Sequence, residues 1–174
     1  MQVIRIGSKL ISREKIDRVI DETLLLRVQG YSQQEVANRL NLDRTFVSRL
    51  EKMGEIRKGR RIAVIGFPIQ NTVELKKMLQ EEGVEYTLLL TDKERWEFVQ
   101  SGNGVDLLNS VMKIITDLRI YDTVLVIASN YRVRLCQAIL DKEVVGFEIG
   151  KSPIEDDKYV PVEEIREIIR QIMI

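Results

Sequence analysis

Hydrogen-bond donors suited to nucleic acid gather between residues 44 and 52, in the stretch RTFVSRLEK. If this stretch is helical, its polar side chains point outward and its apolar side chains point inward. Guanidinium, hydroxyl and ammonium groups are donors of the kind that contact the base edges and phosphates of DNA. The predicted outward set is Arg44, Thr45, Ser48, Arg49 and Lys52.

Two short helices must position these donors, and residues 32–53 carry the signals for both. Ser32 is a good N-cap, and Glu35 three residues later completes a capping box. Asn41 can adopt the left-handed conformation that a tight turn needs, and Asp43 or Thr45 can cap the second helix. The inward faces are predicted to be Val36, Ala37 and Leu40, then Phe46, Val47, Leu50 and Met53.

This stretch resembles the helix-turn-helix of the lambda repressor/Cro-like (XRE) transcriptional regulators, over roughly residues 12–56. The resemblance is carried by Gln33, Glu35, Val36, Ala37, Leu40, Leu42, Val47, Ser48, Arg49, Leu50 and Glu51. Asn41 stands where the family usually has a turn glycine. The resemblance implies that Arg44, Thr45, Ser48 and Arg49 face the major groove of double-stranded DNA, with Gln33 and Lys52 on phosphates. The alternative is an ordinary helical hairpin in a core.

Composition argues against several classes of chemistry. The chain has 174 residues, enough for one medium domain or two small ones, and it contains no histidine. The usual general base and the commonest zinc ligand are therefore missing, and we predict neither catalytic residues nor a metal site. The single cysteine, Cys136, is predicted to be a core residue. No apolar run of about 18 residues occurs, so we expect no membrane span and a cytoplasmic location.

Charge is divided unevenly along the chain. Residues 1–60 hold 13 Lys and Arg against 8 Asp and Glu, a balance of +5, and the remaining residues balance at −5. A basic N-terminal part fits a polyanionic partner. Arg57 and Lys58 either contact phosphates beside the second helix of the motif or belong to a solvated linker. We predict a DNA-binding domain at residues 1–58 and a second domain at residues 59–174.

The residues before the motif predict a further helix. Residues 1–11 form either a short strand or an arm that packs on a neighbour. Ser12 can cap a helix that runs through Val28, and the N-terminal domain is otherwise expected to be all-α. Its inward residues are predicted to be Ile16, Val19, Ile20 and Leu24, with Leu26 as a further candidate. The apolar run 24–26 serves either the fold or a dimer contact.

From residue 61 onward, short apolar runs alternate with helical patterns. Strands are expected at 61–67, 84–90, 121–128 and 144–149, and a break is expected at Ser101–Gly104. Such alternation predicts an α/β domain with a small, mostly parallel four-stranded sheet. We expect the strand order 2-1-3-4 of a Rossmann-like or flavodoxin-like sandwich.

Ligands of such sheets bind outside the carboxyl ends of the strands. The residues that the sequence places there are Gly66, Asn71, Ser129, Asn130 and Arg132. They either bind a phosphate or carboxylate, or they merely cap helices and face solvent. No complete glycine-rich phosphate motif occurs, and no cofactor is predicted.

Three hypotheses follow for the whole chain. The first is a sequence-specific DNA-binding transcriptional regulator, a homodimer, whose α/β domain dimerises or senses a small-molecule effector. The second is a nucleotide- or small-molecule-binding α/β protein, or an enzyme of that class, with an accessory helical domain. The third is a protein-interaction module that uses the Leu24–Leu26 patch or the acidic C-terminal face.

Overall fold

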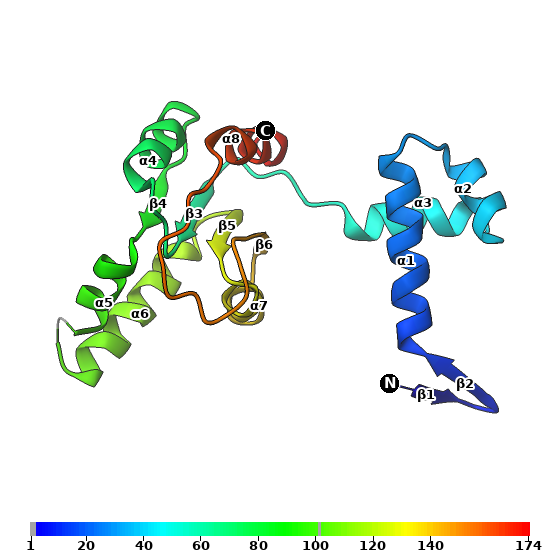
Figure 1. Cartoon of the computed structure of the whole chain (residues 1–174), viewed down its shortest axis with the longest axis horizontal. Coiled ribbons are helices and arrows are strands. Elements are labelled where there is room, and N and C mark those ends of the chain that lie inside the picture. Colours follow the sequence, from blue (N-terminus) through cyan, green and yellow to red (C-terminus); the bar gives the residue numbers. More distant parts are fainter. Residues whose placement is uncertain (1–2, 101) are drawn as a thin grey trace. The chain divides into compact units, whose positions relative to one another are not determined.

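A computed structural model describes residues 3–100 and 102–174 of the chain (Figure 1). It divides into two compact units, Met1–Glu55 and Ile56–Ile174. Within the predicted N-terminal segment, residues 1–2 lie outside the described part, and so does Ser101 of the predicted break. Across the described residues, none of the helices combines the length and the apolar character needed to cross a membrane.

The first unit begins with a β-hairpin, so the prediction of an all-α N-terminal domain is wrong. Strands β1 (Val3–Ile6) and β2 (Lys9–Ser12) pair antiparallel. Gly7 lies between them with φ +58°, a left-handed conformation that glycine adopts without steric cost. The apolar residues at 3–6 and 10–11 therefore belong to paired strands, one of the two alternatives for this segment.

Three helices follow the hairpin: α1 (Arg13–Val28), α2 (Gln33–Leu40) and α3 (Arg44–Gly54). The predicted capping box is confirmed, because Ser32 Oγ accepts from the Glu35 amide and Glu35 Oε2 accepts from the Ser32 amide at 2.7 Å. Asn41 has φ 53°, as expected for the tight turn. Asp43 occupies the N-cap position of α3 without a capping hydrogen bond from its side chain.

The core of this unit is small. Val36, Ala37 and Val47 are its buried apolar residues, and they pack against partly buried neighbours that include Leu26 and Leu40. The inward placement of four other residues is wrong, since all four are exposed: Ile16 (45%), Leu24 (43%), Phe46 (39%) and Met53 (75%). Three short helices enclose too little volume to cover every apolar side chain that their sequence provides.

The second unit is built on an all-parallel sheet of strands β3 (Ile62–Gly66), β4 (Tyr86–Leu89), β5 (Thr123–Ala128) and β6 (Glu143–Glu148). The order is β4-β3-β5-β6, which confirms the expected 2-1-3-4. Every residue of β3 and β5 is buried. The two central strands are therefore covered on both faces, as parallel strands require, and this explains their continuous apolar sequences.

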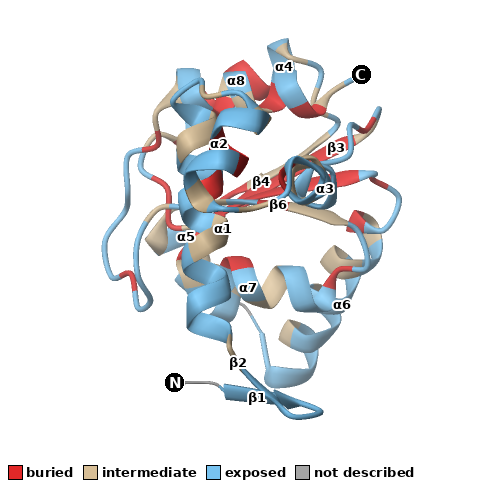
Figure 2. Ribbon diagram, turned by 90° about the vertical axis from the view of Figure 1, so that its right-hand side faces the viewer, coloured by how far each residue is buried: buried red, intermediate tan, exposed pale blue. Residues whose placement is uncertain are grey.

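Five helices accompany the sheet: α4 (Thr72–Glu81), α5 (Asp92–Gln100), α6 (Gly104–Leu118), α7 (Asn130–Ile139) and α8 (Val162–Ile172). α4 and α8 pack on one face through buried residues such as Leu79 and Ile169. The end of α6 and the inner side of α7 pack on the other face through Leu118 and Val133. Figure 2 shows the resulting concentration of buried residues on the strands.

Candidate functional site

The outward face of α3 carries the predicted DNA-binding donors. Arg44, Thr45, Arg49 and Lys52 are exposed, whereas Ser48 is half-buried. Among the described residues, the side chains of Arg44, Arg49 and Lys52 form no ion pair with a carboxylate. Their charges are therefore available to an external anion.

Glu51 is the one carboxylate of α3, and it is turned toward the other helices. Arg27 of α1 forms an ion pair with its Oε1, and Gln33 Nε2 of α2 donates to its Oε2 at 2.7 Å. These two hydrogen bonds are the main reason that the pKa of Glu51 is lowered from its ordinary value. Gln33, predicted as a phosphate contact, is thus also part of the bracing between the three helices.

An apolar groove lies between α1 and α3, with a volume of about 800 Å³. Ile20 and Leu24 line it from α1, and Leu50 and Met53 line it from α3. The polar side chains of Gln33, Ser48 and Lys52 also reach it. The sequence places apolar residues on both helices, but only the packing shows that the exposed ones share one groove.

Arg57 and Lys58 belong to the second unit. There they line a polar depression together with acidic residues that include Asp122 and Asp141. Asp122 also accepts hydrogen bonds from the amides of Arg60 and Arg61, at 2.9 and 3.1 Å. The predicted DNA-binding residues are therefore divided between the two units, and the basic segment has carboxylates beside it.

At the carboxyl edge of the sheet, Asn71 has a structural task. Its Nδ2 donates to the Val160 carbonyl at 2.9 Å, and its Oδ1 accepts from the Val160 amide at 3.0 Å. Val160 lies in residues 149–161, which join β6 to α8 and which we call the C-terminal connection. This connection also bridges to the end of β3, between Lys158 and Ile69. Asn71 therefore holds the connection across the edge of the sheet.

Asn130 and Ser129 are also engaged within the protein. Asn130 Oδ1 accepts from the amides of Tyr131 and Ser152, at 2.8 and 3.1 Å. Ser129 Oγ accepts from the Arg132 amide at 3.4 Å as the N-cap of α7. Gly66 is needed for packing, since a Cβ there would lie 2.8 Å from the Ile127 carbonyl oxygen. These contacts support the capping alternative for Ser129, Asn130 and Asn71.

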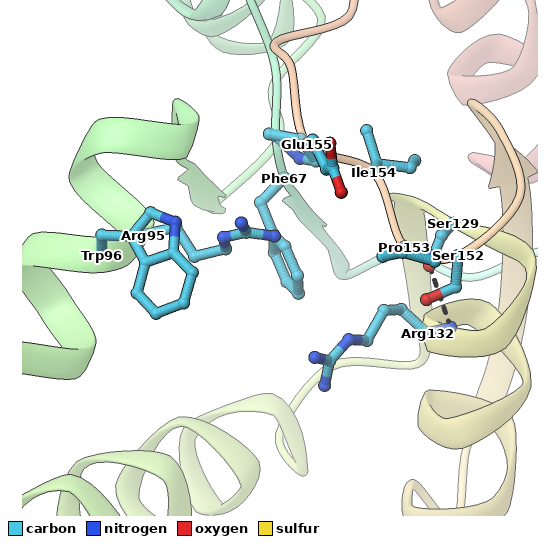
Figure 3. A pocket seen from close by; sticks show the side chains of 10 residues that line it. Phe67, Arg95, Trp96, Ser129, Arg132, Ser152, Pro153, Ile154 and Glu155 are labelled. Carbon is cyan, nitrogen blue, oxygen red and sulfur yellow. Dashed lines mark hydrogen bonds between the residues drawn. The ribbon is translucent and has the colours of Figure 1, made fainter.

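A cavity of about 310 Å³ opens at this edge (Figure 3). Of the five predicted ligand residues, only Ser129 and Arg132 line it; Gly66, Asn71 and Asn130 do not. The other walls come from Phe67 and Pro68 after β3, from Arg95 and Trp96 of α5, and from residues 152–155 of the C-terminal connection.

Sequence reasoning missed Arg95 and Trp96, although a signal for them existed. They follow the second strand of the sheet by a few residues, and the carboxyl ends of parallel strands share one edge. In Figure 3 the Arg95 guanidinium reaches toward the ring of Phe67, and Arg132 extends toward the same space from α7. In residues 3–100 and 102–174, no group of three or more acidic or cysteine side chains is arranged to hold a metal ion.

Comparison with known proteins finds no matching family model, no matching curated protein and no matching solved structure. The resemblance to XRE-type regulators stays a prediction that rests on residues 12–56.

Proposed function

We propose that the chain is a sequence-specific DNA-binding transcriptional regulator, and that α3 is its recognition helix. The observation that carries this proposal is the charge arrangement of α3. Its cationic side chains face outward without intramolecular ion pairs, while its one carboxylate, Glu51, faces inward and is paired with Arg27. Such a face attracts phosphates and offers donors to base edges without repelling the polyanion.

The geometry of the helices supports the same proposal. α2 and α3 are joined through Asn41 and a hydrogen bond from the Leu42 amide to the Ala37 carbonyl at 2.8 Å. A small core of Val36, Ala37 and Val47 braces the two helices. In this proposal α2 lies across the DNA backbone and the first turns of α3 enter the major groove, as in helix-turn-helix proteins.

We further propose that the chain acts as a homodimer. The groove between α1 and α3 exposes Leu24 and Met53, and the hairpin exposes Ile6 and Leu10 by 62% and 73%. A second copy that covers these side chains would remove apolar surface from water and would present two recognition helices to a two-fold operator. Sedimentation equilibrium of the wild type and of Leu24→Lys tests this: the wild type is expected to dimerise, and the variant is expected to dissociate.

Selection from a randomised duplex library tests the DNA-binding function for any operator sequence. The selected duplex is then titrated by fluorescence anisotropy beside a scrambled duplex. We expect Arg49→Ala to weaken binding to the selected duplex by about 1–3 kcal/mol, because a guanidinium contact to a base is lost. Failure to enrich any sequence, with no binding to either duplex at low salt, would overturn the proposal.

Arg18→Ala provides a matched control. Arg18 lies on α1, and its side chain is 67% exposed beside Glu14. Loss of its charge changes the net charge of the chain as much as Arg49→Ala does. If the two variants bind the selected duplex equally, α3 is not the recognition helix.

A further inference from the structure

We propose that the cavity at the carboxyl edge of the sheet binds a mononucleotide, with the phosphate at Arg132 and Arg95 and the base against Trp96 and Phe67. This inference does not depend on DNA binding by the first unit. It rests on the side chains that the fold of the second unit brings together from α5, α7, the end of β3 and the C-terminal connection.

Two guanidinium groups line the cavity from opposite sides (Figure 3). Arg132 is exposed and, among the described residues, forms no ion pair with a carboxylate. Arg95 forms an ion pair with Asp92 on its own helix, and its side chain is only 24% exposed, so its position is fixed. Guanidinium groups bind phosphate and carboxylate oxygens through paired hydrogen bonds, which identifies the ligand as an anion.

The anion cannot be held mainly by the backbone at the start of α7. The first amides of that helix are already used: Asn130 N donates to the Gly150 carbonyl, Tyr131 N to Asn130 Oδ1, and Arg132 N to Ser129 Oγ. The lack of a glycine-rich phosphate motif agrees with this arrangement. Charge recognition therefore falls to the arginine side chains.

The walls of the cavity call for a planar ring. Trp96 is 51% exposed, which is a large apolar surface for a side chain to leave in water, and Phe67 lies half-buried across the cavity. Pro68, Pro153 and Ile154 complete an apolar lining. Aromatic side chains stack on nucleobases of every kind, so such walls favour a base over an aliphatic acid.

The remaining polar group and the volume narrow the class further. Glu155 lines the cavity and would repel an anion placed beside it, but it can accept hydrogen bonds from ribose hydroxyls or from an amino group of a base. The volume of about 310 Å³ lies at the lower end of the range of small-molecule sites, roughly 300–1,000 Å³. A mononucleotide fits this size better than a dinucleotide does.

Calorimetric titration of the full-length protein with AMP, GMP, CMP and UMP tests the inference. Trp96 is the sole tryptophan of the chain, so its fluorescence reports directly on the cavity. We expect at least one mononucleotide to bind saturably and to change this fluorescence. The matching nucleoside, inorganic phosphate and the aromatic carboxylate indole-3-acetate should each bind at least tenfold more weakly, because each lacks the ring, the phosphate or the ribose.

Substitutions on α7 give the matched pair of variants. Arg132→Ala should weaken mononucleotide binding at least tenfold, and Arg132→Lys should weaken it less. Arg134→Ala removes an exposed arginine of the same helix that does not line the cavity, and it should bind as the wild type does. Three results would overturn the inference: no mononucleotide binds at millimolar concentration, indole-3-acetate binds as tightly as any mononucleotide, or Arg132→Ala and Arg134→Ala bind equally well.

Discussion

Asn71 and Val160 exchange two hydrogen bonds, although 89 positions separate them in the chain. The amide group of one side chain thereby satisfies both backbone polar groups of a residue that is fully buried. This exchange ties the start of α4 to the C-terminal connection. Since residues 152–155 of the same connection line the cavity, the pair also contributes to the shape of that site.

We predict that Asn71→Ala lowers the free energy of unfolding of the second unit by about 1–3 kcal/mol, because the buried amide and carbonyl of Val160 lose their partner. Asn71→Asp should destabilise at least as much, since a carboxylate replaces the donor that faces the Val160 carbonyl. Urea denaturation followed by Trp96 fluorescence measures both. Asn109→Ala, at an exposed position of α6, should leave the midpoint unchanged. Equal stability of Asn71→Ala and the wild type would contradict this account.

Gly66→Ala is predicted to destabilise the sheet by about 1–3 kcal/mol through overpacking. The added Cβ would lie 2.7 Å from Ile69 Cδ1 and 2.8 Å from the Ile127 carbonyl oxygen, and a backbone atom of a central strand cannot easily move away. Gly104→Ala is the control, because nothing lies within 4 Å of the corresponding Cβ. The same denaturation experiment decides, and a neutral Gly66→Ala would show that the strand ends adjust more freely than their contacts suggest.

Glu51 should make the first unit more stable at neutral pH than in acid. Its native pKa is lowered, chiefly by the hydrogen bonds from Arg27 and Gln33, so the ionised form is favoured by folding. That stabilisation is complete above the ordinary glutamate pKa, about 4.3, and it is lost as the pH falls through the lowered native pKa.

Glu51→Gln tests this pH dependence. At pH near 7 the variant should be less stable than the wild type by about 1 kcal/mol, a modest value because the pair is partly exposed. The difference should shrink below pH of about 4. Helical circular dichroism during urea unfolding gives the measurement, and Glu164→Gln on the exposed side of α8 is the control. A difference that stays constant down to low pH would show that ionisation of Glu51 is not its cause.

Lys52→Ala is predicted to weaken DNA binding without changing sequence preference. If Lys52 contacts one phosphate, its removal should reduce the slope of log K against log salt by about 0.9. Anisotropy titrations of the selected and scrambled duplexes across a salt series measure the slope and the preference together. Lys77→Ala, on α4 of the second unit, should change neither. A lost preference for the selected duplex would assign Lys52 to base contacts instead.

Much of the local structure could be predicted from the sequence, because capping, turns and strand burial depend on near neighbours. The capping box of Ser32 and Glu35, the left-handed Asn41 and the strand order 2-1-3-4 are confirmed. The sequence of the β-hairpin is compatible with both a strand and a packing arm, since a segment with apolar residues on both faces does not reveal whether it finds a partner.

Contacts between distant segments were decided only by the tertiary structure. Ile16, Leu24, Phe46 and Met53 have apolar side chains at helical spacing, yet three short helices cannot enclose them all. Asn71 and Asn130 follow strands as ligand residues do, but the C-terminal connection occupies their polar atoms. Arg95, Trp96 and Arg132 meet at one cavity because parallel strands end at the same edge of the sheet. Residue types and periodicity therefore determine the elements, whereas packing decides which side chains remain free to bind.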